Sequence, residues 1–274
     1  MAYDYTSELK RVKDYYAGDN LQKRFSALVT GETNAGKTFL LRTARKPIHI
    51  DSFDPGGTKC LRDLISSGDV VADTRWEDED PFAPNKFADW MKSIEVRFQI
   101  GYFEKFGTYC LDSATTWGDA VMNYQLNSAN RAGESPRRNQ DYMPQKILMQ
   151  NYIRKLMRLP CDFILTGHLR EIEEILHIDP KTGIQRKDVK YRFYTTGQAM
   201  VTIPLLFDEI YVIIGEGAKD REPKRKMLID SMGTYIARSR LKANGKLEAV
   251  EAPDIKALLR KIGLDWSDKA KLEV

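Results

Sequence analysis

The sequence predicts an α/β protein in which helices cover both faces of a mostly parallel β-sheet, with antiparallel strands and hairpins toward the C-terminus. Short apolar runs that end in polar or glycine-rich turns alternate with segments whose apolar residues recur at helical spacing. After residue 168, apolar and polar residues alternate instead, which indicates antiparallel strands. With 274 residues and 42% hydrophobic content, the chain is long enough to form one sizeable core.

The parallel part of the sheet is predicted from four short apolar runs. These strand candidates lie at residues 25–30, 48–51, 109–112 and 162–166. Two intervening segments, 87–98 and 149–156, place apolar residues on one helical face, and Pro160 ends the second of them. Because strands joined through helices usually pair in parallel, these elements predict helices packed on a parallel sheet.

The C-terminal half is predicted to be antiparallel. Residues 172–178 and 184–193 flank the turn-forming sequence at 179–183 and predict a β-hairpin. Further antiparallel strands are predicted at residues 207–214, 226–230 and 234–238. The segment 127–140 carries no periodic pattern and is expected to be a mobile loop.

Helices are also predicted near both ends of the chain, at residues 7–16 and 254–262. The predicted organisation is an N-terminal helical extension at 1–22, a core at 23–242 and a C-terminal helical tail at 243–274. We expect a cytoplasmic protein without membrane contact, because no run of about 18 apolar residues occurs and the first residues do not read as a signal peptide. The net charge of +4 permits a nucleic-acid partner without arguing for one.

Cysteine usage agrees with a reducing compartment. The three cysteines, Cys60, Cys110 and Cys161, are odd in number and lack the spacing of a metal site. Two of them lie in apolar, strand-like runs, so we expect buried, reduced thiols.

The most informative stretch is a strand that leads directly into Gly31-x-x-x-x-Gly36-Lys37-Thr38, with helix-forming residues after it. Glycines at this spacing let backbone N–H groups turn toward phosphate groups, the lysine reaches the β and γ oxygens, and the threonine hydroxyl ligates Mg²⁺. The candidate nucleotide-binding residues are Gly31, Glu32, Thr33, Asn34, Ala35, Gly36, Lys37, Thr38 and Phe39. The sequence therefore predicts a site for ATP and Mg²⁺.

Acidic residues at the ends of two strands complete this prediction. Asp112 ends the strand at 109–112 and is the candidate second Mg²⁺ ligand beside Thr38. In the turn after the strand at 48–51, Asp54 is the better candidate for orienting the attacking water, and Asp51 at the strand end stays open as an alternative. The sequence Asp54-Pro-Gly-Gly is also consistent with an ordinary turn.

Together these motifs resemble the RecA-like recombinase ATPases, and among them the phage nucleotide-binding proteins that act as single-strand annealing ATPases. The resemblance covers roughly residues 23–242 and rests on the order of the phosphate loop, the acidic turn, the strand ending in Asp112 and the strand ending at Gly167-His168. It implies that His168 senses the γ-phosphate. It also implies that Arg238 and Arg240 reach into the nucleotide site of a neighbouring subunit.

The resemblance further implies partners. It implies a homo-oligomer, ring or filament, that binds single-stranded DNA and promotes annealing or strand pairing in phage-type recombination. A single-strand-binding protein would be a further partner, and the compartment would be the cytoplasm of a bacterial host.

Two candidate DNA-contacting segments carry basic residues with interleaved aromatic residues, which suits a single strand. The first is the segment 127–140, with Arg131, Arg137 and Arg138. The second is the predicted hairpin, with Lys181, Arg186, Lys187, Lys190 and Arg192 beside Tyr191 and Phe193. The basic run 219–226 is expected to be an exposed connection between strands.

Other functions stay open at this point. A motor or packaging ATPase commonly has glutamate after the Mg²⁺ aspartate, where this chain has Ser113. A small-molecule kinase would need an arginine-bearing lid and an acceptor pocket, and neither is identifiable. The RecA-like family usually has glutamate in the acidic turn, where this chain has aspartate. This departure keeps a nucleotide-binding scaffold with little turnover among the alternatives.

Overall fold

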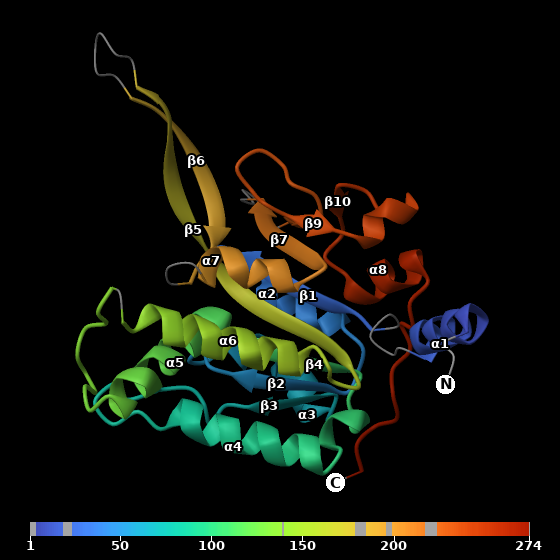
Figure 1. Cartoon of the computed structure of the whole chain (residues 1–274), viewed down its shortest axis with the longest axis horizontal. Helices are drawn as coiled ribbons and strands as arrows, with labels where there is room; N and C mark the ends of the chain where they lie inside the picture. The colour runs from blue at the N-terminus through green and yellow to red at the C-terminus, as the bar shows by residue number, and fades with distance from the viewer. Residues whose placement is uncertain are drawn as a thin grey trace.

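A computed structural model describes residues 4–18, 24–138, 140–178, 185–195, 199–216 and 224–273 (Figure 1). Within these residues one ten-stranded sheet forms the centre of the molecule. Its main path runs in the order β10-β8-β7-β1-β5-β4-β2-β3, while β6 pairs with β5 and β9 pairs with β7. The predicted fold class, a mostly parallel α/β sheet with antiparallel strands toward the C-terminus, is confirmed.

Six neighbouring strands of the sheet are parallel. They are β1 (Ser26–Gly31), β2 (Ile48–Ser52), β3 (Val70–Asp73), β4 (Thr108–Asp112), β5 (Asp162–Ile178) and β7 (Glu209–Glu216). Two of them differ from the sequence prediction. β3 was not predicted, because it is only four residues long and half of them are partly exposed. β7 was predicted to be antiparallel, yet it pairs with β1 in parallel and with β8 and β9 in the antiparallel sense.

The antiparallel part consists of β8 (Lys224–Leu228), β9 (Arg238–Ser239) and β10 (Val250–Glu251). β9 is shorter than the strand predicted at 234–238. β10 pairs with β8, and α8 (Ile255–Ile262) packs its buried Leu258 and Leu259 into the core. The helix predicted at residues 254–262 is therefore present as α8, and β10 before it extends the sheet.

Side chains of alternate strand residues fill two separate apolar layers, because successive residues of a strand point to opposite faces. Leu28 of β1 joins the core beneath α4 (Lys86–Gln99), α5 (Ala114–Ser128) and α6 (Tyr142–Leu156). Its neighbours Ala27 and Val29 join the core on the opposite face, with α2 (Lys37–Leu40) and α8. Helices thus cover both faces of the sheet (Figure 1).

The remaining helical segments are short. They are α3 (Arg62–Ser66), α7 (Ala199–Thr202) and the 3₁₀ segments η2 (Leu41–Thr43), η3 (Gly57–Leu61), η4 (Tyr102–Lys105), η5 (Pro204–Leu206) and η6 (Leu241–Asn244). No helix in the described ranges is both long enough and apolar enough to span a bilayer.

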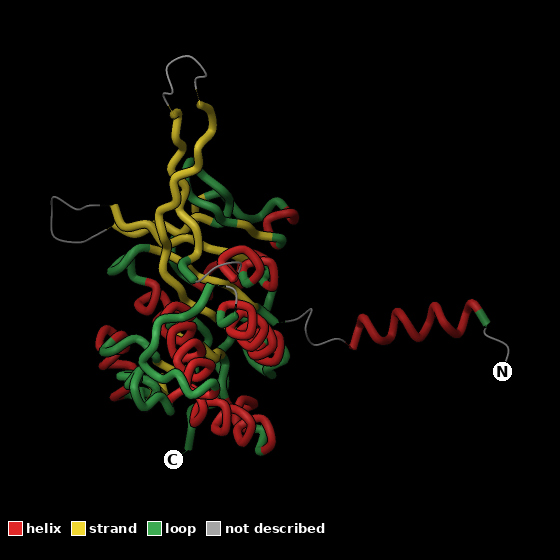
Figure 2. The backbone as a smooth tube through the Cα atoms, turned by 60° about the vertical axis from the view of Figure 1, so that its left-hand side comes forward, coloured by secondary structure: helices red, strands yellow, loops and turns green. Residues whose placement is uncertain are grey.

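Two segments project from the body. β5 and β6 (Gln185–Phe193) form an antiparallel hairpin that extends beyond the sheet, and the predicted turn at its tip lies outside the described residues (Figures 1 and 2). The N-terminal helix α1 (Tyr5–Gly18) stands apart from the body, as Figure 2 shows. The predicted hairpin and the predicted N-terminal helix are therefore present, although β5 is a single long strand where two separate strands were expected.

Candidate nucleotide site

The phosphate loop joins the end of β1 to the start of α2. Gly36, the N-cap of α2, has a φ of 98°, a left-handed conformation that favours glycine. At Gly31 a Cβ atom would lie 2.8 Å from the carbonyl oxygen of Ile213, so the side chain of any other residue would clash with backbone. Both glycines of the motif are thus required by the local structure.

Lys37 lies folded into this loop. Its Nζ atom donates hydrogen bonds to the carbonyl oxygens of Gly31 and Glu32, at 3.1 and 2.9 Å. Burial lowers the pKa of Lys37, while Asp112 and Asp54 act in the opposite direction. A buried ammonium group among carbonyl oxygens and carboxylates is well placed to exchange these partners for phosphate oxygens.

Thr38 and Asp112 meet as predicted for a Mg²⁺ site. Thr38 Oγ1 donates to Asp112 Oδ2 at 2.8 Å, and Thr166 Oγ1 from the intervening strand donates to Asp112 Oδ1. Burial raises the pKa of Asp112, and the hydrogen bonds from the two threonines partly offset this shift. A hydroxyl and a carboxylate oxygen side by side fit Mg²⁺, which takes oxygen ligands and retains several waters.

Asp54 opens onto the same cavity, whose volume is about 580 Å³. Ser113 Oγ and Thr116 Oγ1 both donate to Asp54 Oδ1, at 2.9 and 2.5 Å. Within the described residues no donor reaches Asp54 Oδ2, so this oxygen remains available to a water molecule. The cavity lining includes Thr33, Asn34, Gly36, Lys37, Thr38, Phe39, Asp54, Lys59, Cys60, His168 and Arg225.

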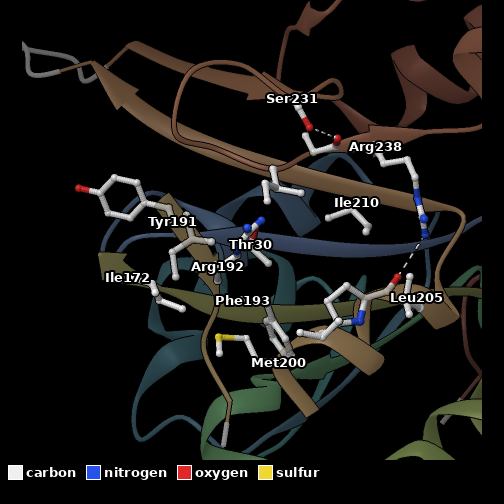
Figure 3. Close-up of a pocket in the computed structure, with 15 residues that line it drawn as sticks. Thr30, Ile172, Tyr191, Arg192, Phe193, Met200, Leu205, Ile210, Ser231 and Arg238 are labelled. Carbon is white, nitrogen blue, oxygen red and sulfur yellow. Dashed lines mark hydrogen bonds between the residues drawn. The ribbon is translucent and has the colours of Figure 1, made fainter. Parts of the chain in front are cut away.

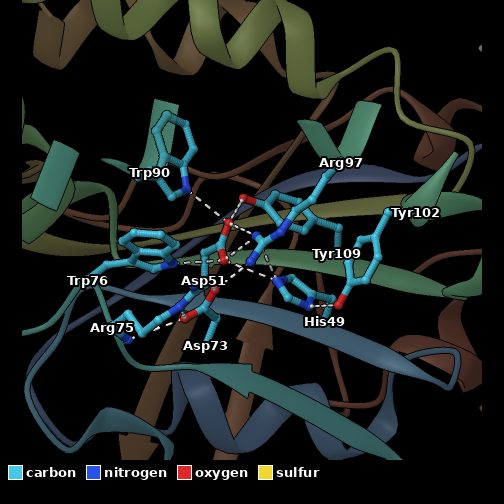
Figure 4. Close-up of polar contacts among 9 residues, drawn as sticks. All are labelled: His49, Asp51, Asp73, Arg75, Trp76, Trp90, Arg97, Tyr102 and Tyr109. Carbon is cyan, nitrogen blue, oxygen red and sulfur yellow. Dashed lines mark hydrogen bonds and ion pairs between the residues drawn. The ribbon is translucent and has the colours of Figure 1, made fainter. Parts of the chain in front are cut away.

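Asp51, the alternative to Asp54, is the centre of a buried polar cluster (Figure 4). Its carboxylate oxygens interact with the side chains of His49, Trp76, Trp90, Arg97 and Tyr109, at distances of 2.7 to 3.0 Å. Burial alone would raise the pKa of Asp51, but His49 and Arg97 hold it well below its usual range. Asp51 has no exposed surface and does not line the nucleotide cavity, so the geometry favours Asp54 as the acidic candidate.

The same cluster contains three residues whose side chains could hold a metal ion. His49, Asp51 and Asp73 place their ligand atoms within 4.8 Å of one another. Arg97 lies between them, because it contacts Asp51 and His49 through Nη1 and Asp73 through Nη2. The guanidinium group supplies the positive charge that a metal ion would bring.

His168 lines the nucleotide cavity, as the resemblance implies. Its position differs from the prediction in one respect, because β5 does not end there but continues to Ile178. Burial and the nearby Lys37 lower the pKa of His168. The main chain of His168 also holds the hairpin base, since its carbonyl oxygen accepts a hydrogen bond from the Tyr194 amide at 2.7 Å.

Arg225 lines this cavity and was not predicted from the sequence, and the same is true of Lys59 and Cys60. Arg225 was placed in an exposed connection, but it belongs to β8 and its guanidinium carbon lies 5.1 Å from the centroid of the Phe39 ring. Residues 224–226 are all basic, so the sequence shows no alternation there that would indicate a strand. Nothing local indicates that its inner face meets the phosphate loop.

Arg238 and Arg240 do not line the nucleotide cavity of their own chain. Arg238 Nη2 donates to the carbonyl oxygens of Pro204 and Phe207, at the rim of a separate, mainly apolar cavity of about 660 Å³ (Figure 3). Arg240 is exposed and pairs with Asp208 at 2.6 Å. The two arginines therefore differ, because only Arg240 has a solvent-exposed guanidinium group.

The predicted DNA-contacting arginines also differ in burial and in their partners. Arg131 is largely buried and pairs with Asp141, which also accepts a hydrogen bond from the Arg137 amide at 2.6 Å. Arg137 and Arg138 are exposed. The structure thus gives Arg131 a role in holding its loop, and leaves the other two side chains at the surface.

In the hairpin, Lys187 is exposed and pairs with Glu173 of the facing strand at 2.6 Å. Arg186 lies in β6, opposite His177, and its side chain is not described. Tyr191 stacks on Tyr235 with ring centroids 4.9 Å apart, and the Phe193 ring covers Gly167. Lys181 lies outside the described residues.

The fold and the site define a P-loop α/β protein. Among solved structures, an ATPase from the type III secretion system of pathogenic bacteria is similar to this chain, with 15% sequence identity and a TM-score of 0.45. The match covers 89% of this chain and 56% of that one, so the chain spans about half the length of the matched protein. No protein-family model and no curated protein matches the sequence. The fold assignment therefore rests on strand order and register.

Proposed function

We propose that this protein is a Mg²⁺-dependent ATPase. The observation that carries the proposal is the contact between Thr38 and Asp112 beside the buried Lys37. Lys37 would exchange its two loop carbonyls for the β and γ oxygens of ATP. Thr38 and Asp112 would hold Mg²⁺, which neutralises charge that develops on the transferring phosphoryl group.

Asp54 is the proposed water-orienting residue. Its Oδ1 accepts hydrogen bonds from the hydroxyls of Ser113 and Thr116, which hold the carboxylate in place at the cavity wall. A carboxylate positioned in this way can accept a hydrogen bond from the attacking water, and positioning is the main contribution a protein makes to phosphoryl transfer.

We further propose that ATP controls binding of single-stranded DNA, and that the protein promotes annealing in phage-type recombination in a bacterial cytoplasm. The support is the continuity of strand β5. His168 lies in the nucleotide cavity, and the same unbroken strand leads into the projecting hairpin. A change in the His168 position on binding the γ-phosphate would be transmitted to the hairpin base through the hydrogen bond to Tyr194.

The proposed DNA surface comprises the hairpin and the loop after α5. Exposed Arg137 and Arg138 supply charge on the loop, and Lys187 supplies charge on the hairpin. Cationic side chains follow the phosphate backbone, and aromatic side chains can stack with bases. Assembly into a ring or filament, an interaction with a single-strand-binding protein, and arginine donation between subunits belong to the same proposal.

The test is fluorescence anisotropy of a labelled single-stranded oligonucleotide with and without ATP, at several salt concentrations. We expect ATP to tighten binding to the parent protein, and to have no effect on a Lys37→Ala variant. A His168→Gln variant should keep basal binding but lose the ATP effect. If the parent binds ATP and its DNA affinity does not respond to it, the recombination function is wrong and a nucleotide-binding scaffold remains.

A further inference from the structure

Arg225 reaches the phosphate loop from the antiparallel side of the sheet. It pairs with Gly215 in the ribbon formed by β7 and β8, and its side chain extends over the loop. A Cβ atom at Gly36 would lie 2.5 Å from Arg225 Nε, which means that the guanidinium stem lies directly against the loop backbone. A side chain at position 36 would therefore displace the Arg225 side chain from the loop.

The charge of Arg225 has no counterpart within the described part of the chain. Arg42, which also lies over Phe39, is paired through both nitrogens with Asp63. Arg225 is half-buried, and none of the described carboxylates forms an ion pair with it. A partly desolvated guanidinium group without a carboxylate beside it is suited to an anionic ligand.

The position of Arg225 identifies that ligand. Its side chain touches Gly36 and Phe39, which flank Lys37 and Thr38 in the phosphate loop. Phosphate oxygens held by the loop would lie within reach of the guanidinium nitrogens, and planar guanidinium groups form paired hydrogen bonds with phosphate. The site thus receives one arginine from its own chain, from a strand about 190 residues after the loop in sequence.

We propose that Arg225 binds the phosphate groups of the nucleotide in cis and couples the β7–β8 ribbon to nucleotide occupancy. The inference rests on the proposed nucleotide function and adds a phosphate-binding residue that the phosphate-loop motif does not include. β8 also pairs with β10, so the C-terminal segment is linked to the same ligand. Without nucleotide, the Arg225 guanidinium group would lie over the Phe39 ring.

The experiment compares Arg225→Gln, Arg225→Lys and the matched control Lys224→Gln in the full chain. Lys224 is the exposed neighbour on the same strand and points to the opposite face. Calorimetric titration with ATP, ADP and AMP in the presence of Mg²⁺ gives the affinities. We expect Arg225→Gln to weaken ATP binding by about 10- to 100-fold, the range for a hydrogen bond to a charged group. The loss should be smaller for AMP, and Arg225→Lys should restore part of it.

The controls separate a binding role from a structural one. The melting temperature without nucleotide should be equal in parent and Arg225→Gln protein, and Lys224→Gln should bind ATP as the parent does. Unchanged ATP affinity in Arg225→Gln would overturn the role of Arg225 while the proposed function stands. Failure of the parent to bind ATP would overturn the proposed function instead.

The cis assignment has its own test. Arg225→Gln chains are mixed with Lys37→Ala chains, and ATP binding is compared with that of each variant alone. A side chain that acts within its own chain cannot rescue a neighbour, so no recovery is expected. Recovery of parent-like affinity at a fraction of the sites would show that Arg225 serves an adjoining subunit, and the cis assignment would be wrong.

Discussion

Thr38 Oγ1 lies 2.8 Å from Asp112 Oδ2, and this hydrogen bond joins residues 74 positions apart in the sequence. The two residues belong to α2 and β4, although β5 separates β4 from the phosphate-loop strand β1 in the sheet. Thr166 of β5 contacts the other Asp112 oxygen and so fills the gap between them. The proposed Mg²⁺ ligands are thus positioned by three strands and the loop together.

Lys37→Ala should reduce ATP binding and abolish hydrolysis while the protein remains folded. Among the described residues, the Lys37 ammonium donates hydrogen bonds to two loop carbonyl oxygens, and its removal leaves the two apolar layers intact. The measurements are calorimetric ATP binding, phosphate release and circular dichroism. Hydrolysis at the parent rate by the purified variant would contradict the phosphate-loop assignment.

Asp54→Asn should keep nucleotide affinity and lose turnover, because an amide cannot orient or deprotonate water as a carboxylate does. Asp112→Asn should in addition raise the Mg²⁺ concentration needed for half-maximal activity. Phosphate release measured across a Mg²⁺ titration separates the two effects. Equal turnover in parent and Asp54→Asn protein would remove Asp54 from the mechanism.

Asp51→Asn should instead destabilise the fold. The substitution removes the charge that balances buried Arg97, and breaking a buried ion pair typically costs about 3–5 kcal/mol. The folded-state pKa of Asp51 lies below its unfolded value, so its contribution is fully present above pH ~4 and is lost as the pH falls further. Urea unfolding at pH 7 and pH 3 tests both points, and parent and variant should differ less at the lower pH.

The outcome for Asp51 shows where sequence reasoning reached its limit. Residues 48–54 identify a strand and an acidic turn, and the phosphate loop is fully local in sequence, so both were predictable. The choice between Asp51 and Asp54 depends on Trp76, Trp90 and Arg97, which approach Asp51 only in the folded chain. Arg225 likewise enters the site through the pairing of β8 with β7, which no local pattern specifies.

The DNA-binding prediction is best tested with Arg137 and Arg138 alone. Replacing both by alanine should weaken single-strand binding equally for different sequences. It should also flatten the slope of log affinity against log salt by roughly 0.7 for each DNA phosphate that the protein no longer neutralises. Arg131→Ala is the matched control for a structural effect, because its ion pair with buried Asp141 predicts lower stability. An unchanged slope in the double variant would move the DNA surface to the hairpin around Lys187.

The last prediction concerns arginine donation between subunits, and the structure divides the two candidates. Arg238 is held by the carbonyl oxygens of Pro204 and Phe207, so Arg238→Ala should mainly lower the melting temperature. Arg240 is exposed and pairs with Asp208, an ion pair of the kind that contributes little to stability, so Arg240→Ala should fold normally.

If Arg240 completes the site of a neighbour, Arg240→Ala should retain ATP binding and lose hydrolysis by roughly a thousandfold, the range for arginines that stabilise phosphoryl transfer. Mixing with Lys37→Ala chains, which are inactive in their own sites but still carry Arg240, should restore part of the activity. Light scattering confirms that the two variants assemble together. Activity of the mixture no higher than that of the separate variants would restrict Arg240 to its ion pair with Asp208, and catalysis would then depend on residues of a single chain.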